Sequence, residues 1–173
     1  MIETEVKIRV QEPKAARARL LGLGCVVARE RHLESNVLYD DAAGTLLSRR
    51  EAIRLRTVGK RAWLTFKGAP LKARSFKVRT ELESEVRDPA AFRKILKALG
   101  LRPVFRYRKH RTLFRGARLA VCLDETSVGC FIELEGKRSD IVRFARVLGH
   151  GRADFITRDY IEMIRAADAG PKD

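Results

Sequence analysis

The sequence predicts an α+β fold in which a strongly curved or closed antiparallel sheet carries helices on its outer face. Predicted strands outnumber predicted helices about two to one. Short connections separate most of the strands, and short connections favour antiparallel pairing. Several strands also alternate between charged and apolar residues, so that one face of the sheet is ionic and the other is apolar. Amphipathic helices can cover the apolar face, which leaves the ionic face for the interior of the curved sheet.

Each predicted element has a local reason. A strand over 2–10 alternates charged and uncharged residues without a break, and Pro13 then suits the first turn of a helix that ends at Gly24. Asp88 and Pro89 provide a cap and a first turn for a second helix. The other expected strands are 26–31, 33–40, 52–58, 62–68, 76–86, 104–114 and one over 119–123 that continues through 131–134. The second helix is expected over 90–99 and a third over 139–148, and 46–50 is expected to be a short helical or irregular segment. We expect 160–165 to be a strand or a helix and 166–173 to be a flexible tail.

Composition limits the partners of the chain. Its 173 residues fit one domain, and 37 Lys and Arg against 22 Asp and Glu give a net charge of +15. This charge favours an anionic partner, which is a nucleic acid, a membrane surface or a phosphate-rich small molecule. The three cysteines show no CxxC spacing, which indicates reduced thiols. No apolar run approaches the ~20 residues needed to cross a bilayer, so we expect a cytoplasmic protein without membrane association.

Residues of both signs share the ionic face on strand after strand. If this face lines a closed sheet, the charges need partners there, because isolated buried charges are costly. A polyphosphate with Mg²⁺ or Mn²⁺ meets that need, since Lys and Arg bind phosphate oxygens and Glu-x-Glu pairs on a strand can hold a hard cation. A nucleic-acid groove would not need so many co-facial carboxylates. The residues on these faces are Glu3, Glu5, Lys7, Arg54, Arg56, Lys67, Glu81, Glu83, Lys109, Arg111, Glu133 and Glu135.

The motif Glu3-x-Glu5-x-Lys7 resembles the signature of the CYTH superfamily, the triphosphate tunnel metalloenzymes. This superfamily includes class IV adenylate cyclases, thiamine triphosphatases and inorganic triphosphatases. Similar blocks follow in the family's order: Leu38-Tyr-Asp40, Ala52-Ile-Arg-Leu-Arg56, Leu64-Thr-Phe-Lys-Gly68, Arg79-x-Glu81-x-Glu83, Lys109-x-Arg111, Leu123-Asp-Glu125 and Phe131-Ile-Glu-Leu-Glu-Gly136. The resemblance implies one domain over residues 1–165, built as an eight-stranded antiparallel closed β-barrel, a tunnel with helices packed outside.

The resemblance also implies roles for individual residues. The triphosphate-binding set is expected to be Lys7, Arg54, Arg56, Lys67, Lys109 and Arg111. Glu133 and Glu135, with Asp124, resemble the ligands of one metal ion, whereas Glu3 and Glu5 resemble the pair that binds a second ion or orients the nucleophile. Glu81 and Glu83 are expected to be supporting acids. Glu3, Glu5 and Lys7 are therefore the expected catalytic residues, with two Mg²⁺ or Mn²⁺ ions as cofactors.

Three functions remain open from the sequence. The favoured one is hydrolysis of inorganic triphosphate or an organic triphosphate such as ATP or thiamine triphosphate. The second is a class IV adenylate cyclase that forms cyclic AMP and pyrophosphate; the His-Phe pair that such cyclases carry before the first motif is missing here, which weakens that alternative. The third is a non-catalytic module that binds polyphosphate or RNA 5′-triphosphate ends. A further departure is Asp159-Tyr160, where family members often have Ser-Tyr. The sequence leaves open whether the chain forms a homodimer.

Overall fold

The eight strands of the protein form a closed barrel. The structure is a computed structural model that describes residues 2–170. Hydrogen-bonded neighbours follow the order β1-β5-β4-β3-β2-β6-β7-β8, which closes on itself. The elements are β1 (Ile2–Val10), α1 (Pro13–Gly22), β2 (Val26–Asp40), α2 (Thr45–Ser48), β3 (Ala52–Val58), β4 (Arg61–Lys67), β5 (Lys77–Val86), α3 (Pro89–Ala98), β6 (Arg102–Gly116), β7 (Leu119–Thr126), β8 (Gly129–Glu135), α4 (Arg138–Val147), the 3-10 turn η1 (Arg152–Asp154) and α5 (Tyr160–Asp168). The predicted α+β fold and the closed eight-stranded antiparallel barrel are confirmed.

Three elements differ from the prediction. The two strands expected over 26–31 and 33–40 are one strand, β2, because no glycine or proline interrupts the segment. The strand expected to continue from 119–123 through 131–134 is a hairpin of β7 and β8, whose turn is closed by the Thr126 hydroxyl, which donates to the Gly129 carbonyl at 2.7 Å. The segment starting at Tyr160 is a helix that continues to Asp168, beyond the expected start of a tail. The rest of that predicted tail, at 171–173, lies outside the described residues.

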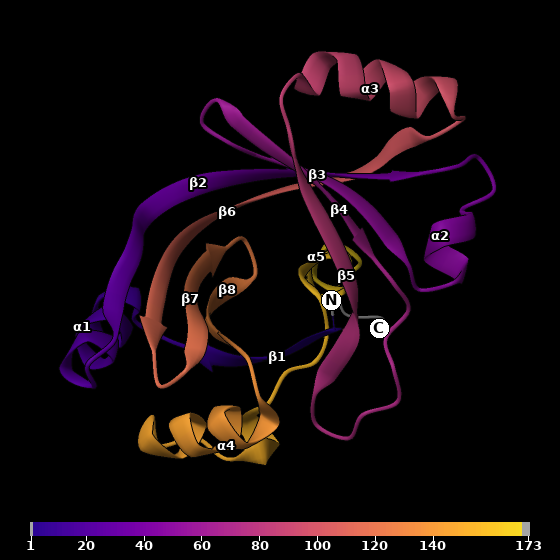
Figure 1. Ribbon diagram of the computed structural model, residues 1–173. Helices are drawn as coiled ribbons and strands as arrows, with labels where there is room; N and C mark the ends of the chain where they lie inside the picture. The colour runs from indigo at the N-terminus through magenta and orange to yellow at the C-terminus, as the bar shows by residue number, and fades with distance from the viewer. Residues whose placement is uncertain (1, 171–173) are drawn as a thin grey trace. The chain divides into compact units, whose positions relative to one another are not determined.

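The described chain divides into two compact units, which we treat separately. Unit 1 comprises residue 2 with 33–71 and 79–108, and unit 2 comprises 3–32, 72–78 and 109–170. In unit 1, helix α3 lies across the strands β3, β4 and β5 (Figure 1). Leu96 of this helix packs with Tyr39, Leu55, Ala62 and Val86, which form the buried apolar cluster of the unit. The apolar face of the unit 1 strands is therefore covered by a helix.

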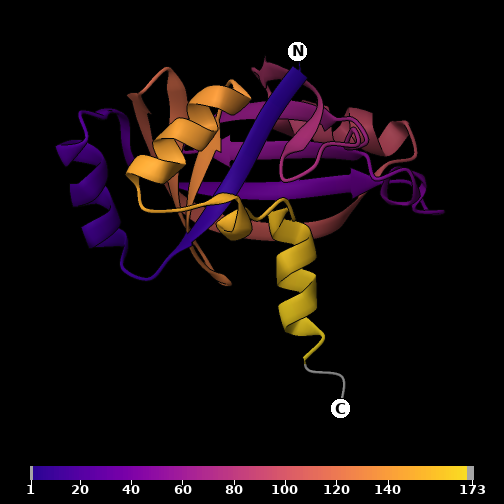
Figure 2. The same cartoon turned by 90° about the horizontal axis from the view of Figure 1, so that it is seen from below.

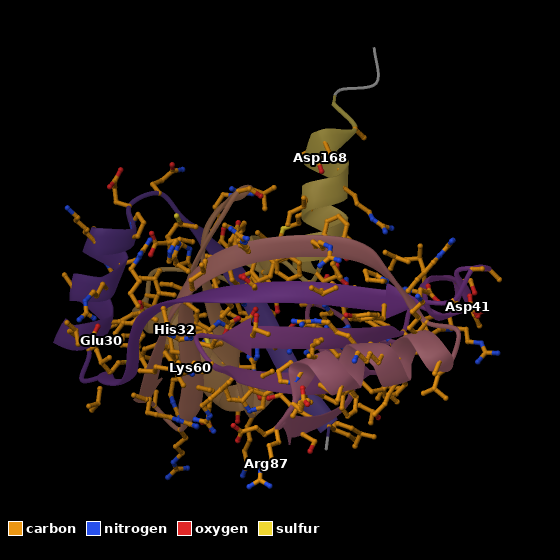
Figure 3. The ribbon with its side chains drawn as sticks, turned by 90° about the horizontal axis from the view of Figure 1, so that it is seen from above. Glu30, His32, Asp41, Lys60, Arg87 and Asp168 are labelled. Atoms are coloured by element: carbon orange, nitrogen blue, oxygen red, sulfur yellow. The ribbon has the colours of Figure 1, made fainter. Side chains whose placement is uncertain are left out.

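A sharp turn links β2 to α2 in unit 1. Asp40 is 3% exposed and its carboxylate accepts backbone hydrogen bonds from Asp41, Leu46 and Leu47 at 2.8–3.0 Å. Figure 3 shows Asp41 at this connection, where its own carboxylate accepts from the backbone N–H of Thr45 at 3.0 Å. These bonds satisfy N–H groups at the start of α2, which explains the Leu38-Tyr-Asp40 block as a structural feature.

Unit 2 has its own apolar core, formed by strands β1, β7 and β8 with helices α1 and α4. Figure 2 shows α4 beside β1, and its residues Ile141 and Phe144 belong to the same buried cluster as Val6, Ile8 and Leu134. Helix α1 contributes Ala16 and Leu20 to that cluster. At the surface, Glu30 lies beside α1 (Figure 3) and accepts hydrogen bonds of 3.2 Å from Arg17. No helix described within residues 2–170 has the length and apolar character that a membrane crossing would require.

Candidate functional site

Charged side chains are buried in both units. Lys, Arg, Glu and Asp are almost never fully buried in proteins unless they are paired, so such a concentration marks a candidate site. The buried charged residues are Glu5, Lys7, Glu34, Asp40, Lys67, Lys77, Arg79, Lys109, Asp124, Glu133 and Asp140. Five of them, Glu5, Lys7, Lys67, Lys109 and Glu133, lie on the strand faces that the alternation predicted to be ionic.

Asp124 on β7 is the centre of the charged cluster in unit 2. Its side chain is 0% exposed and faces Arg111 directly across the β6–β7 pair. Arg111 donates from Nε to Asp124 Oδ1 at 2.7 Å and from Nη2 to Oδ2 at 2.6 Å. Lys109 Nζ donates to the same Oδ2 at 2.8 Å. Both oxygens of this carboxylate are therefore occupied by cationic donors, and the fork of Arg111 is held in one orientation.

Lys7 on β1 joins two further carboxylates of unit 2. Its Nζ lies 3.0 Å from Glu5 Oε1 and 3.4 Å from Glu133 Oε2. Burial alone would lower the pKa of Lys7, but the negative charges of Glu5 and Glu133 outweigh this effect and raise the pKa above its ordinary value. The other oxygen of Glu133, Oε1, accepts from Arg111 Nη2 at 2.8 Å. Glu133 thus connects Lys7 with the cluster around Asp124.

Tyr160, the first residue of α5, lies against the same cations. Its hydroxyl donates to Asp124 Oδ2 at 2.8 Å, and burial, with the charge of Asp124, raises the pKa of the phenol well above its usual value. The Nζ atoms of Lys7 and Lys109 lie 5.1 and 4.9 Å from the centre of its ring. The ring therefore supports both ammonium groups by cation–π contact. Tyr160 is placed here because Asp159 caps α5, with Asp159 and Glu162 forming a reciprocal capping box.

The face of unit 1 opposite the α3-covered apolar cluster carries a second charged cluster. Arg56 Nη2 donates to Glu83 Oε1 at 2.8 Å, and Arg54 Nη2 lies 3.5 Å from Glu83 Oε2. Lys67 donates to Glu81 from the facing position on the neighbouring strand. Arg56 Nη1 also lies 3.4 Å from Glu34, which is 2% exposed. These contacts hold three cations on one face of the sheet.

The structure groups most of the predicted site residues. Glu5, Lys7, Lys109, Arg111, Asp124 and Glu133 lie in the unit 2 cluster, and Arg54, Arg56, Lys67, Glu81 and Glu83 lie in the unit 1 cluster. Glu3 is half-buried near the start of β1, and Glu135 is exposed at the end of β8. Glu135 faces Glu5 in the β1–β8 register. The chemical roles assigned to these residues stay predictions.

Sequence reasoning missed several residues of the two clusters. Lys77 is 5% exposed, and its Nζ lies 3.5 Å from Glu5 Oε1 and 3.7 Å from Asp159 Oδ2. Continuing the odd-numbered alternation of β5 back from Glu81 would have found it. On β2, the residues at alternate, even-numbered positions share a face in the same way, and this alternation would have found Glu34 and Asn36. Tyr160 was noted only through the family's Ser-Tyr pattern, and no local pattern predicts its contact with Asp124, because it reaches that residue from a helix 36 residues further along the chain.

The oxygen-rich clusters fit the chemistry of Mg²⁺ or Mn²⁺, which both prefer carboxylate ligands. Among residues 2–170, however, no three Asp, Glu, His or Cys side chains are already grouped around a position for one ion. The carboxylates are instead paired with Lys and Arg. A divalent ion bound by Glu5 or Glu133 would therefore replace part of their contact with Lys7, Lys77 or Arg111.

The chain is similar to known proteins over nearly its whole length. A structure from Vibrio parahaemolyticus described as a "putative adenylate cyclase" matches with a TM-score of 0.85 and 21% identity, over 95% of this chain and 98% of that one. The PH1012 protein from Pyrococcus horikoshii matches with a TM-score of 0.78 and 24% identity, over 93% and 98% of the two chains. A protein from Hippeastrum, described as a "putative adenylyl cyclase" with a dominant triphosphatase activity, matches with a TM-score of 0.69 and 20% identity, over 95% and 96%.

At these identities the solved structures show the fold alone. No curated protein matches the sequence. The family model of the CYTH domain matches residues 1–160, which include both charged clusters, the Glu3-x-Glu5-x-Lys7 motif and the first residue of α5. The resemblance predicted from the motifs is thereby confirmed, and the chain belongs to the CYTH domain family.

Proposed function

We propose that the chain is an Mg²⁺- or Mn²⁺-dependent enzyme that hydrolyses triphosphates. The observation that carries this proposal is the set of buried cations, each held by carboxylates on the same sheet face. In unit 2, Lys7, Lys109 and Arg111 are within hydrogen-bond distance of Glu5, Asp124 or Glu133. Phosphate oxygens accept hydrogen bonds from Lys and Arg side chains as carboxylate oxygens do. A bound triphosphate can therefore replace the carboxylates as the hydrogen-bond acceptor of these side chains.

Each group of residues has its own part in the proposal. Lys7, Lys109 and Arg111 in unit 2 bind phosphate oxygens, and so do Arg54, Arg56 and Lys67 in unit 1. Glu3, Glu5, Glu133 and Glu135 are the proposed metal ligands. A divalent ion held by these residues would supply positive charge that stabilises the phosphoryl group and would lower the pKa of a water molecule.

In this proposal Asp124 positions the cations around it, although the family resemblance implies that it is a metal ligand. Its two oxygens are taken by Arg111, Lys109 and Tyr160. It therefore holds the guanidinium and the ammonium in place before the substrate arrives. Donors that are fixed in advance stabilise the charge that develops on the phosphoryl oxygens without having to reorganise during the reaction.

The test is a turnover assay on inorganic triphosphate, ATP and thiamine triphosphate with Mg²⁺ or Mn²⁺. Orthophosphate and cyclic AMP are measured separately, because two of the structures named above are described as putative cyclases. We expect metal-dependent release of orthophosphate, and we expect Glu5→Gln to lower kcat by about 10²-fold or more. The matched control is Glu125→Gln, which changes the same chemistry at a partly exposed residue paired with Arg31.

Three results would contradict the proposal. Release of orthophosphate from none of the three triphosphates would exclude the hydrolase. Cyclic AMP as the main product from ATP would assign the cyclase reaction. Tight triphosphate binding without turnover, unchanged in Glu3→Gln and Glu5→Gln, would indicate a binding module.

A further inference from the structure

Asn36 on β2 is a buried amide whose hydrogen-bonding groups are not used within the protein. It is the single asparagine of the 173-residue sequence, and it is 1% exposed. Neither its Oδ1 nor its Nδ2 atom has a hydrogen-bond partner among the described residues. Leaving a polar group buried and unpaired costs free energy, so an amide retained in this state indicates a partner that is not part of the chain.

The position of Asn36 places it at the unit 1 cluster. It faces Arg56 across the β2–β3 pair, and Arg56 faces Trp63 across the β3–β4 pair. These three residues therefore form one cross-strand row. The next row contains Arg54 and Thr65, and its Arg54 Nε is also buried without a hydrogen-bond partner among the described residues. Unused polar atoms thus occur in two adjacent rows of the same sheet face.

Asn36 and Arg54 differ in the ligand chemistry that they can satisfy. The Arg54 Nε atom can only donate, which suits a phosphate oxygen. An amide both donates and accepts, and a fully ionised phosphate oxygen has no hydrogen to give to Asn36 Oδ1. A hydroxyl group can accept from Nδ2 and donate to Oδ1, so it satisfies the amide where a phosphate would leave its oxygen unpaired. The half-buried Trp63 lies in the same row, two strands from Asn36, and its ring centre is 5.2 Å from the guanidinium carbon of Arg56 between them.

We propose that Asn36 forms a subsite for a hydroxyl group of an organic triphosphate, next to a row that binds its phosphates. This inference rests on the proposed function and extends it, because it selects a hydroxyl-bearing organic triphosphate over inorganic triphosphate. The cross-strand order of unit 1 also orients that substrate. Its phosphates lie toward Arg54 and its organic group lies toward Asn36.

The first experiment measures direct binding to the natural chain, with divalent metal removed by a chelator so that substrate is not consumed. Dissociation constants are determined by calorimetry for inorganic triphosphate, for ATP, GTP, CTP and UTP, and for the 2′-deoxy and 3′-deoxy form of each nucleotide. We expect at least one ribonucleotide to lose about tenfold in affinity when one hydroxyl is deleted. This comparison needs no protein variant, so it remains decisive if a variant does not fold.

The second experiment repeats the titrations with Asn36→Leu, which keeps the approximate size and removes both hydrogen-bonding groups. We expect the affinity for the hydroxyl-bearing ligand to fall by about tenfold, and the affinities for its deoxy form and for inorganic triphosphate to stay within about twofold. The matched control is Thr57→Val on the opposite face of β3, where the hydroxyl donates only to the Ser35 carbonyl at 3.5 Å. This control should change none of the affinities.

The outcomes separate this inference from the proposed function. If no hydroxyl deletion weakens binding, or if Asn36→Leu weakens inorganic and organic triphosphates equally, the hydroxyl subsite is wrong while triphosphate binding stands. Unchanged affinities throughout would show that Asn36 only holds a buried water. If the natural chain binds no triphosphate either with the chelator or with Mg²⁺ or Mn²⁺ added, the proposed function and this inference are both refuted.

Discussion

Replacing Asp124 with asparagine tests whether the unit 2 cluster is held together by one buried carboxylate. The substitution keeps the shape of the side chain and removes its charge. Asp124 is 0% exposed, and the two cations that it pairs with, Lys109 and Arg111, have side chains that are 3% and 14% exposed. Water cannot replace the lost carboxylate at such positions, so Lys109 and Arg111 both lose a charged partner, although Arg111 keeps its contact with Glu133.

The expected loss of stability follows from this burial. Removing one partner of a buried ion pair typically lowers the free energy of unfolding by about 3–5 kcal/mol. Small domains have about 5–15 kcal/mol in total, so the effect is a large part of the stability. Tyr160→Phe removes only the neutral hydroxyl donor to Asp124 and should cost about 0.5–1.5 kcal/mol. The neighbouring Glu125→Gln, whose partner Arg31 is 52% exposed, should cost only about 0.2–1 kcal/mol.

Urea unfolding followed by circular dichroism measures all three variants against the natural chain. We expect the midpoints to fall in the order Glu125→Gln, Tyr160→Phe and Asp124→Asn, with the last the lowest. Equal midpoints for Asp124→Asn and Glu125→Gln would refute the reasoning, because they would mean that solvent reaches the cluster and screens its charges.

Three further predictions follow from single residues. Burial raises the pKa of the Cys122 thiol to about 12, so its thiolate fraction at pH 8 is about 10⁻⁴. Iodoacetamide should therefore label the less buried Cys130 well before Cys122, as measured by mass spectrometry. Equal labelling of the two cysteines in the native protein would contradict this prediction. Because the pKa of Lys7 is raised above its ordinary 10.5, the contribution of its charge to stability is complete below pH 10.5 and declines as the pH rises further. The urea midpoint of unfolding should therefore drop above pH 10.5. A midpoint that does not change with pH in this range would contradict the prediction. Asp159→Ala removes the cap of α5, worth about 1 kcal/mol, together with a carboxylate 3.7 Å from the buried Lys77, whereas Asp159→Ser keeps a capping oxygen and should restore only the part of the midpoint that is due to the cap.

The fold was predictable because its signal is periodic. Alternation in 2–10 and 52–58 identified the ionic and apolar faces, and the observed register keeps Lys7 and Glu133 on one face, directly opposite each other. Helix limits also followed from local chemistry, since Asp88 caps α3 as expected, accepting from the backbone of Ala90 and Ala91. These features depend on neighbours within a few residues, which a sequence displays directly.

The contacts that complete the clusters depend instead on long-range packing. Tyr160 meets Lys7 and Asp124 only because α5 begins where the chain returns to the sheet, and alternation says nothing about that position. The same limit applies to Asp124. The family resemblance implies that it is a metal ligand, which stays a prediction, and only the three-dimensional contacts show that both of its oxygens accept hydrogen bonds from cationic donors.

The charges of unit 2 give a reason to expect metal dependence that does not rely on family resemblance. Its cluster contains four cations, which are balanced by four carboxylates: Lys7, Lys77, Lys109 and Arg111 against Glu5, Asp124, Glu133 and Asp159. The net charge of +15 therefore resides mainly outside this cluster. A triphosphate that enters a balanced cluster brings several negative charges into a poorly hydrated place, where an uncompensated charge is costly. Divalent cations that enter with the triphosphate remove this cost, so we expect the triphosphate to bind more tightly with Mg²⁺ than without it. Equal affinities in the two conditions would show that the chain's own cations suffice.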